Sequence, residues 1–253
     1  MSALHSIGGE RVRIMVGGLL CGCPVGSVVV QRLVLFDLDN TLVDRDEAFR
    51  RWAVGFCEER GLPADAFAWL VATDGDGFAP RDWFFGEVKG RLGLTASVDR
   101  LWGDYRQRMP ELVSCRPGVL DMLVALRRQG WRMAIVTNGQ ADNQLGKIRR
   151  TGLDRHVDAW AVSGELGIRK PARELFEAAA RGCGLDLADG GWAVGDSPTL
   201  DVEGGRGAGL ATVWISRGQT WPAELSPPDQ VCGAVEGVEE VLFGADPAGV
   251  ERA

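Results

Sequence analysis

The sequence is poor in histidine and carries no excess of positive charge. Its 253 residues include two histidines, His5 and His156, so imidazole-based zinc sites and Ser–His–Asp triads have few candidate residues. Lysine and arginine number 28 against 35 aspartate and glutamate residues, which gives a formal net charge of −7. Because an acidic surface repels phosphate backbones, we expect no nucleic-acid partner.

Paired cysteines are also lacking. In a chain of this length, scattered cysteines without a CxxC motif do not indicate a disulfide framework. We expect reduced thiols that are buried as small hydrophobic side chains in a cytoplasmic protein. The six are Cys21, Cys23, Cys57, Cys115, Cys183 and Cys232.

Long hydrophobic runs are absent too. The stretch from Ile14 to Cys23 follows Arg11 and Arg13 and faintly resembles a signal peptide, but it is too short and too rich in glycine to span a membrane. A predicted core strand begins at about Arg32, which leaves almost no linker after a cleavage. We therefore expect residues 1–31 to be a disordered or loosely attached extension, for which an upstream start codon would account, and no membrane partner.

From Arg32 onward, short apolar runs alternate with segments of helical spacing. This alternation predicts an α/β fold, with a doubly wound, Rossmann-like parallel sheet covered by helices on both faces. The expected strands are 33–36, 133–136, 157–162, 192–194 and 211–215, and the expected helices between them include 117–130, 141–150 and 171–183.

Residues 46–115 interrupt this alternation. Phe49, Trp52, Ala53 and Phe56 have the spacing of one helix face, and the segment contains no good buried strand. We interpret 46–115 as an inserted helical cap subdomain and assign 32–45 together with 116–253 to the α/β core. Within the cap, residues 74–77 are expected to form a turn, since the ligand spacing of a calcium loop is absent.

Polar residues end three of the expected strands. They are Asp37, Thr137 and Asp196, and they should converge because ligands bind beyond the carboxyl ends of parallel strands. Asp37 and Asp39 are two residues apart, and their repulsion is costly unless a cation or a shared proton relieves it. A hard divalent cation with oxygen ligands, such as magnesium, fits. Each of these patterns alone also occurs in ordinary loops and helix caps.

Three further patterns accompany this pair. Thr137, with Asn138 and Gly139 after it, offers a hydroxyl and free backbone amides to an anion. Lys170 stands just before a helix, where its charge could lie between a carboxylate and a phosphoryl oxygen. Asp196 and Asp201 follow the 192–194 strand and offer two more carboxylates to a metal.

In this order, the four motifs resemble those of the haloacid dehalogenase-like superfamily in its phosphatase branch. The resemblance extends over roughly residues 32–215, and the helical insertion is similar to that family's cap between the first and second motifs. It implies that Asp37 attacks phosphorus and that Asp39 serves as general acid and then base. Lys170 would stabilise the charged transition state.

The resemblance also implies the binding residues. Thr137 and the backbone of Asn138 would hold phosphoryl oxygens. Asp37, the backbone carbonyl of Asp39 and Asp196 would bind Mg²⁺, with Asp201 assisting. Because dehalogenases of the family lack an acid two residues after the nucleophile, the presence of Asp39 favours phosphate as the substrate group.

Several alternatives remain open at this point. A phosphomutase would share the aspartyl-phosphate, and a non-catalytic regulatory module could use the same scaffold to bind phosphate. The sequence Gly195-Asp196-Ser197 superficially resembles GDS-type esterases, but no histidine follows position 156. A dinucleotide-binding oxidoreductase needs GxGxxG after the first strand, where it is absent.

The resemblance leads us to expect a small phosphorylated metabolite as substrate, such as a sugar phosphate or an organic acid phosphate. In the family the cap supplies specificity. Candidate contacts are Arg50, Arg51, Arg81, Trp83 and Phe84, each of which is also typical of a surface charge or a core aromatic residue. Nothing in the sequence indicates the oligomeric state.

Overall fold

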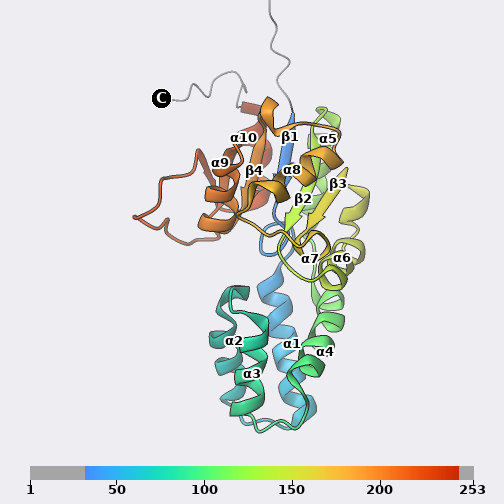
Figure 1. Cartoon of the computed structure of the whole chain (residues 1–253), viewed down its shortest axis with the longest axis vertical. Coiled ribbons are helices and arrows are strands. Elements are labelled where there is room, and N and C mark those ends of the chain that lie inside the picture. Colours follow the sequence, from blue (N-terminus) through green and yellow to red (C-terminus); the bar gives the residue numbers. More distant parts are fainter. Residues whose placement is uncertain (1–31, 245–253) are drawn as a thin grey trace, which may run out of the picture.

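The computed structural model describes residues 32–244, which form a parallel sheet with a group of helices beyond one of its ends (Figure 1). The six strands lie in the order β3-β2-β1-β4-β5-β6, and all are parallel. From β1 the chain first adds strands on one side and then crosses to the other, so β1 and β4 flank the point where the order reverses. The strands are β1 (Leu33–Phe36), β2 (Arg132–Thr137), β3 (Ala159–Val162), β4 (Trp192–Gly195), β5 (Ala211–Ile215) and β6 (Gln230–Cys232).

Strand β1 shows why the sheet is covered on both faces. All four of its residues are buried, and they alternate between two hydrophobic cores. Val34 and Phe36 pack in one core, whereas Leu33 and Leu35 pack in the other. Each such buried side chain contributes on the order of 1.5–3 kcal/mol. A four-residue strand with no polar side chain is therefore stable only between two layers of helices.

Each face of the sheet has its own helices. Helix α5 (Pro117–Arg128) and helix α10 (Val238–Gly244) contribute to the core that contains Phe36. Helix α8 (Arg173–Gly182) contributes to the core that contains Leu33. Further helical elements are α6 (Ala141–Arg150), α7 (Ser163–Leu166), a π-helical segment (Pro198–Glu203) and α9 (Gly204–Gly207).

Four helices between β1 and α5 form a bundle below the sheet in Figure 1. We call this group the helical bundle; it consists of α1 (Arg45–Arg60), α2 (Ala66–Asp74), α3 (Arg81–Arg91) and α4 (Val98–Leu112). Asp44 caps α1 by accepting a hydrogen bond from the Glu47 amide, and Gly61 ends α1 in a left-handed conformation. Aromatic rings fill the bundle, and Trp52 and Tyr105 meet edge to face at 5.0 Å between centroids.

The predicted fold class is confirmed, and the expected strands correspond to β1–β5. Strand β6 was not predicted, because it has three residues at the sheet edge and two of them, Gln230 and Val231, are exposed. The turn predicted at residues 74–77 is present. It consists of the last residue of α2 and a short 3₁₀ turn. The interpretation of 46–115 as a separate cap subdomain stays a prediction, and the predicted extension of residues 1–31 lies outside the described residues.

Four cysteines lie within the described part of the chain, and all four are free thiols. Cys183 and Cys232 are buried as predicted, whereas Cys57 and Cys115 are half-buried, so for these two the expectation of burial was wrong. Across residues 32–244, no helix combines the length and apolarity needed to cross a membrane. The cytoplasmic location stays a prediction.

Candidate active site

Three carboxylates meet at the carboxyl ends of β1 and β4. Asp37 follows β1, Asp196 follows β4, and Asp201 lies in the π-helical segment after it. One oxygen from each lies within 4.8 Å of the others. The Ser197 amide donates to Asp201 Oδ2 at 2.9 Å, which turns this side chain back toward β4. These are three of the four residues that the sequence assigns to a metal site.

Lys170 lies inside this group of carboxylates. Its Nζ donates to Asp37 Oδ1 at 2.5 Å and to Asp201 Oδ1 at 2.7 Å, and its side chain is 3% exposed. Asn138 holds the lysine backbone in place. The Lys170 amide donates to Asn138 Oδ1 at 2.8 Å, and Asn138 Nδ2 donates to the Lys170 carbonyl at 3.2 Å.

The cluster has too little positive charge for its carboxylates. Burial raises the pKa of Asp37 to about 7, with Asp201 adding to the rise and Lys170 opposing it. Burial likewise raises the pKa of Asp196 to about 8, helped by the negative charges of Asp37 and Asp201. Hard carboxylate oxygens at this spacing suit Mg²⁺, whose charge would stabilise the ionised acids. The residues present therefore fit a divalent cation.

Asp39 is not one of these three carboxylates and is bound by two side chains of α6. Lys147 Nζ lies 2.8 Å from both Asp39 carboxylate oxygens, and Gln144 Nε2 donates to Asp39 Oδ2 at 3.0 Å. Burial alone would raise the pKa of Asp39, but Lys147 and Gln144 outweigh it and hold that pKa below its ordinary value. Gln144 also donates to Thr137 Oγ1 at 2.6 Å, so it joins the first and second motifs.

Lys147 and Gln144 were missed in the sequence. Both lie on the face of α6 that also carries Ile148, and all three are buried. A helix face that should be apolar but contains a lysine and a glutamine indicates polar partners inside the protein. The sequence contained this signal, but it could not show that Asp39 is the partner of both side chains.

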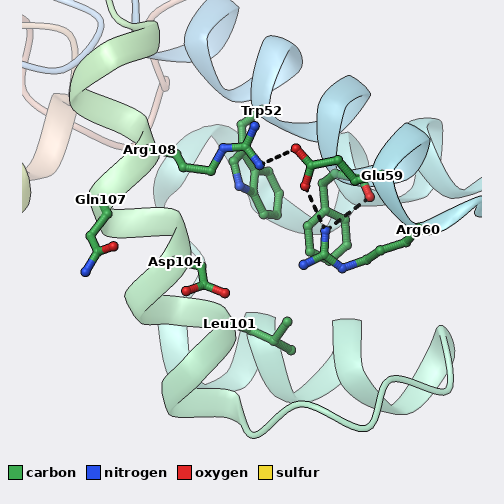
Figure 2. A pocket seen from close by; sticks show the side chains of 8 residues that line it. Trp52, Glu59, Arg60, Leu101, Asp104, Gln107 and Arg108 are labelled. Carbon is green, nitrogen blue, oxygen red and sulfur yellow. Dashed lines mark hydrogen bonds and ion pairs between the residues drawn. The ribbon is translucent and has the colours of Figure 1, made fainter.

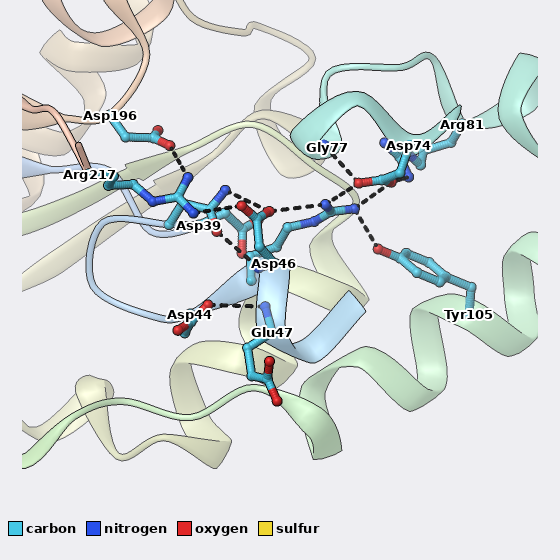
Figure 3. A network of polar contacts seen from close by, with 12 residues as sticks. Asp39, Asp44, Asp46, Glu47, Asp74, Gly77, Arg81, Tyr105, Asp196 and Arg217 are labelled. Carbon is cyan, nitrogen blue, oxygen red and sulfur yellow. Dashed lines mark hydrogen bonds and ion pairs between the residues drawn. The ribbon is translucent and has the colours of Figure 1, made fainter. Parts of the chain in front are cut away.

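Asp196 has two further contacts that the sequence did not reveal. Trp214 Nε1 donates to the Asp196 carbonyl at 2.8 Å, and Arg217 Nη1 donates to Asp196 Oδ2 at 3.2 Å. The same guanidinium donates through Nη2 to Asp46 Oδ2 at 2.6 Å, and Asp46 lies in the first turn of α1 (Figure 3). Ion pairs thus run from the carboxylate cluster to the helical bundle.

A second buried network holds the near end of the bundle together. Arg45 forms a two-pronged pair with Asp74 and also donates to the Tyr105 hydroxyl at 3.2 Å. Arg81 Nη1 donates to Asp74 Oδ1 at 2.7 Å (Figure 3). The Asp74 carboxylate therefore fixes Arg45 and Arg81, and both arginines line a cleft beside the strand ends.

A cleft of about 550 Å³ lies between the strand ends and the bundle. Its size is that of a small-molecule site. The sequence-predicted residues Asp37, Asp39, Thr137, Asn138, Lys170, Asp196 and Asp201 all line it. From the bundle side the lining includes Arg45, Phe78, Arg81, Trp102, Tyr105 and Arg106.

The five candidate specificity residues divide among three environments. Arg81 lines the cleft. Phe84 is fully buried in the aromatic core of the bundle. Arg50, Arg51 and Trp83 are exposed and lie outside the lining of the cleft.

A smaller cavity of about 210 Å³ lies between α1 and α4 (Figure 2). Trp52 and Phe56 contribute to its wall. Of its charged residues, Asp104 pairs with Arg100 outside the cavity, and the others pair with one another or with a ring. Arg108 Nη1 donates to Glu59 Oε1 at 2.6 Å, and the Arg60 guanidinium lies 4.0 Å from the centre of the Phe56 ring. None of the sequence-predicted catalytic, phosphate-binding or metal residues lines this cavity.

The chain is similar in sequence to known hydrolases. The sequence profile of the haloacid dehalogenase-like hydrolases matches residues 31–209. The glyceraldehyde 3-phosphate phosphatase of Methanopyrus kandleri is 34% identical over 211 residues, covering 79% of this chain and 90% of the relative. The enzyme of the same name from Pyrococcus abyssi is 27% identical over 220 residues, covering 83% and 92%.

A solved structure shares the fold. The HAD-hydrolase YfnB of Bacillus subtilis, solved bound to magnesium, is 25% identical to this chain with a TM-score of 0.68. The match covers 84% of this chain and 99% of YfnB.

Proposed function

The chain belongs to the haloacid dehalogenase-like hydrolases, in their phosphatase branch, and from that premise we propose that it is a magnesium-dependent phosphatase acting on a small phosphorylated metabolite. The observation that carries this proposal is the placement of Lys170 between Asp37 and Asp201, with Asp196 beside them. Phosphoryl transfer through a covalent intermediate requires a carboxylate nucleophile, a positive charge and further carboxylates that bind a metal. These groups lie together at the carboxyl ends of β1 and β4.

In the first half of the reaction, an oxygen of Asp37 forms a bond to phosphorus, and the bond from phosphorus to the substrate oxygen breaks. Asp39 gives a proton to that leaving oxygen. Thr137, the Asn138 backbone and Lys170 hold the phosphoryl oxygens. Asp37, Asp196, Asp201 and the Asp39 carbonyl would hold a magnesium ion, whose positive charge would offset the repulsion between nucleophile and substrate.

In the second half, water attacks phosphorus and Asp39 takes a proton from it. The bond from phosphorus to Asp37 breaks, which releases phosphate and restores the carboxylate. Lys147 and Gln144 hold the Asp39 side chain next to Thr137. Asp39 turns one oxygen to the substrate in order to act as the acid, while Lys147 keeps its contact with the other oxygen. The proton that Asp39 takes from water in the second half restores the acid for the next turnover.

The size and lining of the cleft support the proposal of a small substrate. Its volume of about 550 Å³ is shared between strand-end and bundle residues, so the group attached to phosphate would lie against Arg81, Trp102 and Arg106. The relatives named above act on glyceraldehyde 3-phosphate, a small phosphorylated metabolite. Such a substrate is within the size range of this cleft.

Two assays test the proposal. Incubation with p-nitrophenyl phosphate should release nitrophenol with magnesium and not with a chelator, and a panel of phosphorylated sugars and organic acids should identify the preferred ester. Absence of magnesium-dependent turnover across both would overturn the proposal. Hydrolysis without a bisphosphate activator would argue against the phosphomutase alternative.

A further inference from the structure

Arg217 lies between the carboxylate cluster and the helical bundle and contacts both (Figure 3). Its two terminal nitrogens bind different carboxylates, Nη1 to Asp196 at 3.2 Å and Nη2 to Asp46 at 2.6 Å. Asp196 follows β4 of the sheet, whereas Asp46 is the second residue of α1. One side chain therefore joins a candidate metal ligand to the first helix of the bundle.

Both ends of this link are sheltered from water. The side chain of Arg217 is 27% exposed, and those of Asp46 and Asp196 are 20% and 13% exposed. Solvent and salt screen such pairs less than they screen pairs on the open surface. The two ion pairs of Arg217 are thus strong enough for a change in one to alter the other.

Asp46 is also tied to the loop that carries the proposed nucleophile. Asn40 Nδ2 donates to Asp46 Oδ1 at 3.0 Å, and the Asp46 amide donates to Asn40 Oδ1 at 3.0 Å. Asn40 follows Asp37 by three residues. The start of α1 is therefore attached to the site from two sides, through Asn40 and through Arg217.

The backbone of Arg217 indicates that its position is imposed by its surroundings. Its φ of 49° is in the left-handed region, which is unfavourable for a residue with a Cβ and is maintained only where other contacts fix it. The planar guanidinium can bind two carboxylates through two nitrogens at once. A lysine ammonium at the same place lacks this fork.

We propose that Arg217 is a positioning residue that couples occupation of the cation site to the attachment of helix α1. Its single positive charge is shared between Asp196 and Asp46, so whatever changes its hold on one changes its hold on the other. A divalent cation on Asp196 repels the guanidinium and leaves it held more by Asp46. If Asp46 loses its charge, the guanidinium turns fully to Asp196 and competes with the cation. This inference rests on the magnesium role proposed above.

A double-mutant cycle on magnesium binding tests the coupling. Isothermal titration calorimetry with MgCl₂ on the full chain, without substrate, gives the dissociation constants of wild type, Asp46→Asn, Arg217→Gln and the double variant. With Arg217 present, Asp46→Asn should weaken binding about five-fold, the low end of typical coupling between sites. In the Arg217→Gln background the same change should weaken binding by about two-fold or less, because the shared charge is gone and Asp46 keeps only its contacts with Asn40 and Arg45.

Two controls separate coupling from charge and from folding. Glu47→Gln removes one charge from the same turn of α1, but Glu47 pairs with Arg51, so it should weaken binding by about two-fold or less. Thermal melts in a chelator verify that each variant is folded. Asp46→Ser replaces Asp46→Asn should the latter fail to fold. Arg217→Lys keeps the charge but lacks the two-nitrogen fork, so it should reduce the Asp46 effect.

The remaining outcomes contradict the proposal. Equal weakening by Asp46→Asn in both backgrounds would indicate a long-range charge effect, and no weakening in either would mean that Arg217 transmits nothing. A wild-type chain that binds no magnesium would overturn both this inference and the proposed metal dependence. If wild type binds magnesium and hydrolyses p-nitrophenyl phosphate while the cycle is additive, only the role of Arg217 is wrong.

Discussion

The ammonium group of Lys147 lies 2.8 Å from both carboxylate oxygens of Asp39, although the two residues are 108 positions apart in the sequence. Lys147 extends from α6 and is buried, so it holds the proposed acid–base residue at a fixed place beside the cleft.

Lys147→Met should lower kcat on the order of 100-fold, because Asp39 loses the contact that orients it for proton transfer. The measurement is steady-state kinetics with p-nitrophenyl phosphate at saturating magnesium. Arg149→Gln changes an exposed charge on the same helix and serves as the matched control, with kcat expected to stay within about two-fold of wild type. An unaltered kcat in a folded Lys147→Met protein would exclude this orienting role.

Asp37→Asn should reduce turnover on the order of 10⁴-fold or more, because the amide cannot form the covalent intermediate. The fold should survive. Neutralising Asp37 relieves its repulsion with Asp201, so the Tm in a chelator should be equal to or higher than that of wild type. Asp121→Asn, an exposed position on α5, controls for the substitution itself. Retention of the wild-type rate would mean that Asp37 is not the nucleophile.

Magnesium should stabilise the folded chain. A ligand present at 100 times its Kd adds about 2.7 kcal/mol, and for a chain of this size each kcal/mol raises Tm by about 2–4 °C. Differential scanning calorimetry should therefore show a magnesium-dependent rise of several degrees in wild type. Asp196→Asn should remove most of that rise, since it deletes one of the three carboxylates. If the variant retains the full shift, Asp196 is not a ligand.

Asp74→Asn should destabilise the bundle. Asp74 is buried and pairs with Arg45 and Arg81, and removing one member of a buried pair costs roughly 3–5 kcal/mol. The measurement is urea unfolding at pH 7. Asp65→Asn breaks the exposed pair with Arg91 and should cost about 0–1 kcal/mol. Equal costs for the two variants would show that burial does not strengthen the Asp74 pairs.

The contribution of Asp74 should also depend on pH. Burial raises the pKa of Asp74, but the hydrogen bonds and charges of Arg45 and Arg81 outweigh burial and hold that pKa below its ordinary value of 3.8. A carboxyl group with a lowered pKa contributes full stability above the pKa of the unfolded chain and loses it as the pH falls through the folded pKa. The stability difference between wild type and Asp74→Asn should therefore be constant from pH 7 to about 5 and shrink below pH 4. A constant difference down to pH 3 would contradict this.

Local patterns in the sequence were sufficient to predict the fold class and part of the candidate site. The apolar run at Leu33 to Phe36 needs burial on both sides, and the residues that follow each strand must lie at the same edge of a parallel sheet. These two facts are enough to bring Asp37, Thr137 and Asp196 to one cleft. The metal set and the roles of these residues stay predictions.

The missed features depend on partners that are far apart in the chain. Arg217 and Asp46 are 171 positions apart, and each looks like an ordinary surface charge in its own segment. Asp74 lies in a glycine-rich turn and gave no sign of the two arginines that bury it. Strand β6 has too few residues and too much exposure for its pattern to differ from that of a loop.

The paired hydrogen bonds between the Asn138 side chain and the Lys170 backbone have one more consequence. They link the turn after β2 to the segment before α8, so that these two segments move as one unit. Each segment contributes residues to the lining of the cleft. Thr137 and Lys170 therefore move together, and any loosening at position 138 displaces the Thr137 hydroxyl and the buried Lys170 ammonium group in the same movement.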